Sequence, residues 1–368
     1  MGCSSGAGRC GEVEGMSETA EHSPEQPVDY SVEKQLARTV TVTLGWWAHG
    51  AVRLVLAVAM LYYGYAKLVL GQFGVADMGD ALIAQGEMSP MGVLWRMVAF
   101  SPLFQVLAGL AEWGAAIALL WRRSVPLGAV LSAGSMALVF VLNLGYDVPV
   151  KQLSLALLVM SLLVLIPWMP RLARAFLGRG EIPRGPLPTL VPWRPLARIT
   201  NIAGPIAGIV LVVLVGVGVS QMYPPRTVDD AAPAGVWRVA EDTAEPAAQL
   251  SEDERWAALA FGEVRYGEES MAQLRRADGE LLTGAWTRGQ DGTVDLYLRP
   301  LREEGVPLTE HLGDEALELT LTIEEQGDGT LHVTGEGQDL VLTPDESGSM
   351  VYERGFSWGA RPDDPFNR

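Results

Sequence analysis

Long apolar segments dominate the first two thirds of the chain. They cover residues 51–70, 103–121, 126–146, 152–168 and 202–223. Each segment can cross a hydrocarbon core of about 30 Å as a helix that rises about 1.5 Å per residue. The links after the second and third segments are short, which is typical of antiparallel neighbours. The pattern therefore predicts a four-helix membrane bundle and a fifth, anchoring helix.

The hydrophobic pattern changes period beyond residue 236. Apolar and polar residues alternate through 317–323 and 296–298, as expected for strands with one buried face. Asp-Gly dipeptides at 278–279, 291–292 and 328–329 are typical hairpin turns. The C-terminal part is therefore predicted to be an antiparallel meander, and the sequence leaves open whether it forms a barrel or a sandwich.

These patterns divide the chain into six parts. The expected parts are a disordered tail at 1–44, a four-helix membrane domain at 45–175, a basic and Pro-rich loop at 176–200, a fifth transmembrane helix at 201–223, a linker at 224–236 and an acidic soluble β domain at 237–368. Met16 is a second candidate for the start of the chain.

Charge separates the two halves and narrows the function classes. Residues 226–368 contain 31 acidic residues, 12 arginines and no lysine, a net charge of −19. Such a surface disfavours nucleic acid as a partner. The only cysteines, Cys3 and Cys10, lie near the N-terminus, and there is no CxxC motif. Thiol redox chemistry is therefore not expected.

One ionisable residue interrupts the second apolar segment at its centre. Glu112 lies nine positions from Leu103 and nine from Trp121, which puts it near the bilayer midplane. An ionised side chain there costs roughly 2.5–3.5 kcal/mol on insertion scales, so intramembrane acids are candidates for function. The small residues Ala108 and Ala115 share its helix face, so Glu112 is expected to face protein. The alternative is a protonated Glu that only stabilises packing.

Other polar residues are expected to gather toward the outer end of the bundle. The candidate ligand or proton pocket has five members. Glu112 is the deepest, and the others are Lys67, Asn143, Asp147 and Lys151. A protonatable carboxyl, a cation and an amide suit a quinone-type ring or a proton relay. The alternative is a structural network in which Lys67 pairs with Glu112 or Asp147.

No sequence motif indicates another cofactor. The four histidines offer no facing pair of haem ligands, and no zinc, phosphate-loop or hydrolase motif occurs. No covalently bound cofactor is therefore expected, and quinone is the one candidate.

Basic residues predict the orientation in the membrane. Arg122 and Arg123 close the second segment, and six arginines lie between residues 170 and 200. The positive-inside rule places both regions in the cytoplasm. The N-terminus is then cytoplasmic, the β domain lies outside, and the expected location is a bacterial inner membrane.

Several stretches resemble DoxX-like membrane proteins. RLVLAVAMLYYGYAKLV at 53–69 is similar to the first helix of that family, AGLAEWGAAIALLWRR at 108–123 to its second, and NLGYDVPVKQLSLALLVM at 143–160 to its third-to-fourth link. SPLFQ at 101–105 and the closing RGFSW and PFNR resemble the longer members with a soluble domain. The usual Gly pair after the Glu is here Gly114-Ala115.

The resemblance implies a four-helix bundle and a link to oxidation chemistry. Some members are associated with thiosulfate:quinone oxidoreductases or with membrane complexes that protect against oxidative stress, and many have no known activity. The chain is therefore expected to be a subunit or accessory of a membrane oxidoreductase, with lipid and an oxidoreductase or envelope protein as partners. The alternatives are a non-catalytic scaffold whose β domain binds an envelope partner, and a transporter, which the absence of an inverted repeat disfavours.

Overall fold

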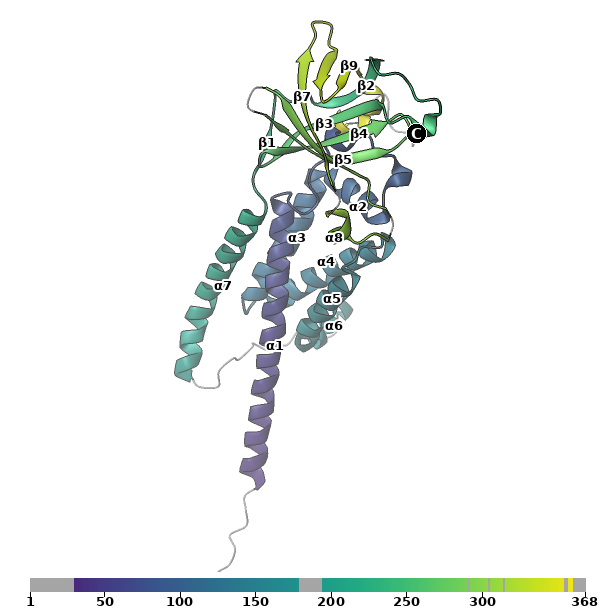
Figure 1. Ribbon diagram of the computed structural model, residues 1–368. Helices are drawn as coiled ribbons and strands as arrows, with labels where there is room; N and C mark the ends of the chain where they lie inside the picture. The colour runs from purple at the N-terminus through teal and green to yellow at the C-terminus, as the bar shows by residue number, and fades with distance from the viewer. Residues whose placement is uncertain are drawn as a thin grey trace, which may run out of the picture.

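A bundle of apolar helices is attached to a β-barrel in the computed structural model, which describes residues 30–178, 194–289, 292–303, 305–313, 315–353 and 357–359 (Figure 1). The helices of the bundle are α1 (Tyr30–Leu68), α2 (Pro90–Ala99), α3 (Pro102–Leu120), α4 (Val125–Gly145), α5 (Lys151–Leu165), α6 (Met169–Leu177) and α7 (Arg194–Met222).

Five helical segments among the described residues are long and apolar enough to cross a membrane. They are Ala37–Leu68, Pro102–Leu120, Val125–Gly145, Lys151–Leu177 and Leu196–Met222. Many of their side chains are exposed in the protein alone, as expected for helices whose outer faces meet lipid. The predicted helical membrane region is confirmed.

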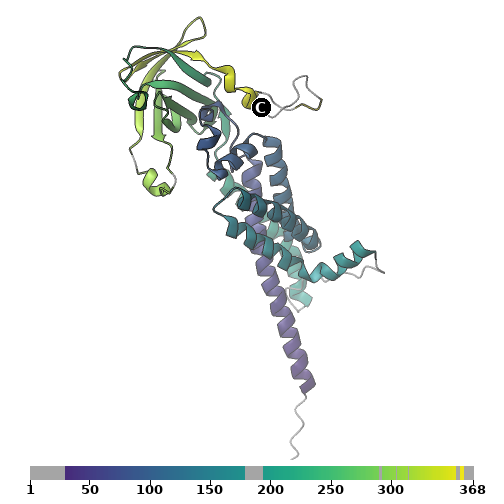
Figure 2. The ribbon, with the colours of Figure 1, turned by 90° about the vertical axis from the view of Figure 1, so that its right-hand side faces the viewer.

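Helix α1 begins earlier than the sequence pattern suggests. Residues 30–44, expected to belong to the disordered tail, are helical from Tyr30 onward. No Pro or Gly interrupts the segment, and Thr39, Thr41 and Thr43 each bond the carbonyl four residues earlier. The first part of α1 extends alone beyond the bundle (Figure 2). The expected tail at 1–29 lies outside the described residues.

The β domain is a closed, eight-stranded antiparallel barrel, which decides between barrel and sandwich. Its strands are β2 (Gly235–Asp242), β3 (Trp256–Tyr266), β4 (Glu269–Arg276), β5 (Leu281–Arg288), β6 (Val294–Pro300), β7 (Leu317–Glu325), β8 (Leu331–Gly335) and β9 (Gln338–Pro344). Neighbours in sequence pair in order, and β2 closes the ring by pairing with both β3 and β9. A short strand, β1 (Arg226–Val228), flanks β3.

Apolar side chains fill the barrel interior. Trp286 and Phe261 are its largest fully buried residues, with ring centroids 6.0 Å apart in an edge-to-face arrangement. The indole N–H of Trp286 donates to the Gly262 carbonyl at 3.1 Å. This barrel is therefore a packed core, and the ligand site must be sought elsewhere.

One expectation about the β domain needs correction, and another lies mostly outside the described residues. The segment 224–236 is not a plain linker, because it contains β1 and the first residues of β2. In the closing RGFSW motif, Trp358 is 95% exposed. Residues 354–356 and 360–368, which hold the other residues of the closing motif, lie outside the described residues.

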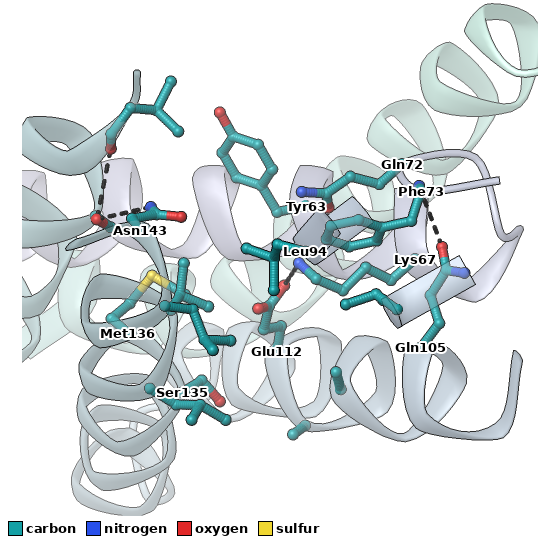
Figure 3. Close-up of a pocket in the computed structure, with 18 of the residues that line it drawn as sticks. Tyr63, Lys67, Gln72, Phe73, Leu94, Gln105, Glu112, Ser135, Met136 and Asn143 are labelled. Carbon is teal, nitrogen blue, oxygen red and sulfur yellow. Dashed lines mark hydrogen bonds and ion pairs between the residues drawn. The ribbon is translucent and has the colours of Figure 1, made fainter. Parts of the chain in front are cut away.

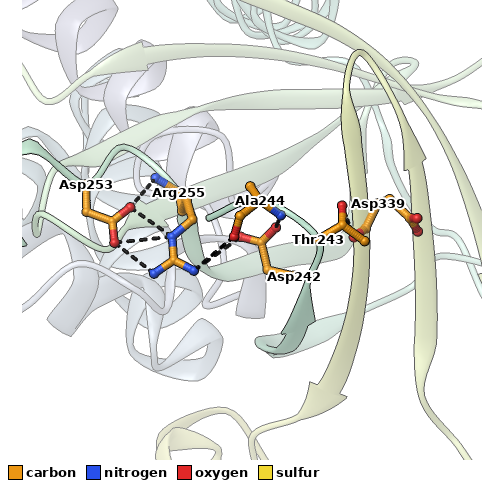
Figure 4. A network of polar contacts seen from close by, with 6 residues as sticks. All are labelled: Asp242, Thr243, Ala244, Asp253, Arg255 and Asp339. Carbon is orange, nitrogen blue, oxygen red and sulfur yellow. Dashed lines mark hydrogen bonds and ion pairs between the residues drawn. The ribbon is translucent and has the colours of Figure 1, made fainter. Parts of the chain in front are cut away.

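Arg255 ties the long connection between β2 and β3 together (Figure 4). Its Nε donates to Oδ1 of Asp253 at 2.9 Å and its Nη2 to Oδ2 at 2.8 Å, a two-point geometry that fixes both side chains. Asp242 at the end of β2 lies 3.9 Å from Nη1. The guanidinium therefore links the end of β2 to the start of β3 across the loop that connects them.

The loop between α1 and α2 binds the barrel to the membrane bundle. Both carboxylate oxygens of Asp77 accept hydrogen bonds from β3, from the backbone N–H groups of Glu263 at 3.1 Å and Val264 at 3.2 Å. Burial raises the pKa of Asp77, and these hydrogen bonds oppose that shift. Arg275 on β4 reaches Glu87 with two hydrogen bonds of 2.6 and 2.7 Å. The barrel is thus positioned by a loop that also carries part of the site.

Candidate functional site

Helices α1 and α3 meet at two glycines. A Cβ on Gly64 would lie 2.7 Å from the backbone nitrogen of Trp113, and one on Gly109 would lie 2.8 Å from the carbonyl oxygen of Gly64. Real Cβ atoms do not come so near to backbone atoms, so only glycine allows this approach. The helices run antiparallel here: a Cβ on Gly109 would lie 3.0 Å from the Cβ of Lys67, and Trp113, next to Glu112, faces Gly64, so the contact brings Lys67 and Glu112 together.

Lys67 and Glu112 form a buried ion pair. Lys67 Nζ lies 2.6 Å from Glu112 Oε2, and the two side chains are 8% and 2% exposed (Figure 3). Removal of either partner would leave a charge without compensation in a medium of low dielectric constant. The sequence left two possible partners for Lys67, Glu112 and Asp147, and the structure shows Lys67 paired with Glu112. The ammonium also lies 5.8 Å from the centroid of the Tyr63 ring.

A cavity of about 180 Å³ adjoins this ion pair. That volume exceeds many-fold the space a single water needs and suits a small ring system. Most of the residues that line it are apolar, and they come from the helices of the bundle and from the loop after α1. They include Phe73, Leu94, Trp95, Val98, Phe104, Met136, Leu138, Val139, Leu142, Val150, Leu153 and Leu157. An apolar chamber with few polar groups is the usual form of a small-molecule site.

Two glutamines that sequence reasoning passed over also line the cavity. Gln105 is fully buried, and its amide nitrogen donates to the Gly74 carbonyl at 3.1 Å while its carbonyl oxygen accepts from the N–H of Phe73 at 3.4 Å. Gln72 Oε1 is buried and has no hydrogen-bond partner among the described residues. Gln72 therefore offers a ligand an unused acceptor.

The SPLFQ stretch explains how Gln105 reaches the loop. Ser101 caps α3 by accepting from the N–H of Phe104 at 3.3 Å, and Pro102 occupies the first turn, where its missing N–H costs nothing. Gln105 follows about one turn later and holds residues 73–74 over the cavity. The sequence signal that could have identified Gln105 is its position about one turn after the Ser-Pro start of the helix.

The structure separates the five predicted site residues into two groups. Lys67, Glu112 and Asn143 line the cavity, and Asn143 donates to the Ser154 hydroxyl at 3.0 Å. Asp147 and Lys151 do not line it. They pair with each other in the α4–α5 link, where the Asp147 side chain is 78% exposed. Asp147 adopts a positive φ of 50°, a left-handed turn conformation that Asp tolerates better than most residues.

The chemistry of the site follows from these groups. A buried ammonium can donate to a ring carbonyl, the paired carboxylate can accept a proton, and the amides can orient a polar edge. Among the described residues, no cluster of three or more His, Cys, Asp or Glu side chains is placed to hold a metal ion.

Comparison with known proteins identifies a bacterial relative. No protein-family model matches the chain, and no solved structure matches it. The "Uncharacterized protein YwoB" of Bacillus subtilis is 35% identical over 127 residues, a match that spans 34% of this chain and 77% of YwoB.

Proposed function

We propose that this chain, which belongs to the family of the uncharacterized protein YwoB, binds a quinone or a similar lipid-soluble ring in the cavity beside Glu112. One observation carries the proposal: a mostly apolar cavity inside the bundle contains a buried Lys67–Glu112 pair and an unsatisfied Gln72 oxygen. An inert packing defect would be lined by apolar groups alone.

Quinone chemistry gives each polar group a task. Lys67 is placed to donate a hydrogen bond to a ring carbonyl, which accumulates negative charge on reduction. Glu112 holds the ammonium in position, and its carboxylate could accept a proton. The electrons would come from a partner oxidoreductase, in keeping with the resemblance to DoxX-like proteins. The chain would then act as a quinone-binding subunit or accessory.

A cavity-filling substitution tests this function. Ala108 lines the cavity, so Ala108→Phe is expected to fill it and to abolish the retention of quinone during mild detergent purification. Leu110 is 48% exposed on the same helix, and Leu110→Phe is the matched control that should retain quinone at the wild-type level. The measurement is mass spectrometry of the extracted lipids.

Two outcomes would contradict the proposal. One is the absence of any ring compound from the wild-type protein, which would favour the scaffold function. The other is equal retention in Ala108→Phe and wild type, which would place the ligand outside the cavity.

The proposal includes an orientation in the bacterial inner membrane. The α3–α4 turn, with Arg122 and Arg123, is placed in the cytoplasm and the acidic barrel outside. In a variant with Cys3 and Cys10 replaced by Ser, a cysteine at the exposed Glu245 should react with an impermeant thiol reagent on spheroplasts, and one at Arg123 should not. The reverse labelling would refute this orientation.

A further inference from the structure

One face of helix α3 is packed against α4 at one end and open at the other. Phe104, Ala111, Ala115 and Ala118 follow one another at spacings of seven, four and three residues, so they share a side of the helix. Ala115 and Ala118 are buried there, and a Cβ on Gly128 of α4 would lie 2.8 Å from the Ala115 carbonyl oxygen. Phe104 and Ala111, earlier on the same face, are exposed. Helix α4 therefore parts from this face of α3 between Ala115 and Ala111.

The gap between the two helices leads into the cavity. Phe104 and Ala111 of α3 and Leu138 of α4 all line the cavity, yet Phe104 is 43% and Leu138 is 54% exposed. Residues that line a cavity and are also exposed border its mouth. Ser135 of α4 lines the cavity as well, and its side chain is as small as that of Ala111 is, so neither closes the gap (Figure 3). Because Glu112 directly follows Ala111, this mouth lies beside the ion pair.

The mouth faces the hydrocarbon of the membrane. Helices α3 and α4 both belong to the candidate spans, and Ala111 lies at the middle of α3. Faces of such helices that are exposed in the protein alone meet lipid. Val150 and Leu153 also line the cavity and are exposed, but they lie at the start of α5, next to the surface pair of Asp147 and Lys151. Compared with that end of the bundle, the mouth between α3 and α4 lies deeper in the apolar core.

The size of the cavity indicates what passes through this mouth. The cavity holds about 180 Å³, less than the roughly 300–1,000 Å³ of pockets that enclose a drug-sized ligand. A ring that fills this space leaves no room for a long hydrocarbon chain attached to it. Such a chain would leave the cavity through the mouth, where apolar side chains and lipid surround it.

We propose that the ligand of the cavity is a quinone with a long hydrocarbon chain, and that the gap bordered by Phe104, Ala111 and Leu138 admits it from the lipid and holds the first part of its chain. This inference rests on the proposed quinone site and narrows its ligand to chain-bearing quinones. Entry from the lipid also gives the ring a route to the buried Lys67–Glu112 pair that avoids the loop over the outer end of the cavity.

Two quinones with the same ring test the mouth, a benzoquinone without a side chain and its decyl derivative. Their affinities for the full-length protein in mild detergent are measured by isothermal titration calorimetry. Leu138→Trp narrows the mouth and is expected to weaken binding of the decyl compound by about 5- to 150-fold, the range expected for overpacking, while the bare ring keeps its wild-type affinity. Leu153→Trp is the matched control, because Leu153 also lines the cavity and is 40% exposed but lies away from the mouth. It should bind both compounds like wild type.

The outcomes separate this inference from the function on which it rests. Wild-type affinity for the decyl compound in Leu138→Trp, or a larger loss in Leu153→Trp, would overturn the mouth. If Leu138→Trp weakens both compounds equally, Ala111→Trp decides from the α3 side: a selective loss of the decyl compound supports the mouth, and equal losses again overturn it. A wild-type protein that binds neither compound would refute the quinone site itself. One that binds the bare ring but not the decyl compound would keep the site and refute the mouth.

Discussion

Replacement of Glu112 by Leu is expected to lower the free energy of unfolding by about 3–5 kcal/mol, the usual cost of removing one partner from a buried ion pair. Lys67 would lose its partner while its side chain is only 8% exposed, and no other described carboxylate forms an ion pair with it. The loss should appear as a lower melting temperature in detergent. Glu112→Gln has a similar volume and can still accept a hydrogen bond, so its melting temperature should fall less.

A double variant supplies the control for the ion pair. Lys67→Met together with Glu112→Leu removes both charges, and an apolar pair of similar size is often as stable as the buried ion pair. The double variant should therefore recover most of the stability that Glu112→Leu loses. A Glu112→Leu protein as stable as wild type, or a double variant that loses the sum of both single effects, would contradict a coupled pair.

The same residues separate a ligand site from a structural contact. If the pair serves a quinone, Glu112→Gln and Lys67→Met should both lower quinone retention, because the ring carbonyl loses its donor or the donor loses its orienting partner. If the pair only stabilises packing, retention should follow the melting temperature. Wild-type retention in both variants would remove the quinone proposal and leave the scaffold function.

Replacement of Gly79 by Ala is expected to detach the barrel from the membrane bundle. A Cβ at this buried position would lie 2.3 Å from the Met271 carbonyl oxygen and 2.7 Å from the Gly262 nitrogen. Both are backbone atoms of paired strands and cannot move aside cheaply. Overpacking of this kind costs roughly 1–3 kcal/mol, which corresponds to an increase of about 5- to 150-fold in local opening.

Hydrogen exchange measures that opening directly. The N–H groups of Glu263 and Val264 donate to Asp77 in the docked state, so they should exchange about 5- to 150-fold faster in Gly79→Ala. Gly86→Ala is the matched control, because the same loop leaves its Cβ without any neighbour within 4 Å. Unchanged exchange in Gly79→Ala, or equal acceleration in the control, would show that the barrel does not depend on this contact.

Detachment of the barrel is also expected to loosen the wall of the cavity. The docking loop continues from residues 72–74, which cover the site and are held by Gln105. Because Arg96 on α2 pairs with Asp80 of the same loop at 2.9 Å, the loop also fixes the helix that carries Leu94 and Trp95. The barrel is therefore expected to stabilise the outer wall of the cavity, although none of its residues lines it.

Local pattern was sufficient for most elements of this protein, although it missed the first part of α1 and strand β1. A run of apolar residues long enough to span a bilayer has no other stable form than a helix in lipid, so the spans could be read directly. The period of two and the Asp-Gly turns likewise predicted the hairpins, because alternate side chains must share one face. The position of Glu112 at the centre of its apolar segment followed from counting residues alone.

Tertiary structure decided which residues meet. Sequence spacing left Lys67 with two carboxylate partners, and the close approach at Gly64 and Gly109 selected Glu112. Asp147 and Lys151 were grouped with the pocket, yet a turn at Asp147 placed their pair at the surface. The roles of Gln72 and Gln105 and the closure of the barrel by β2 depend on contacts between distant segments. Periodicity determines which face of a helix or strand is buried, whereas the geometry of backbone approach determines what that face touches.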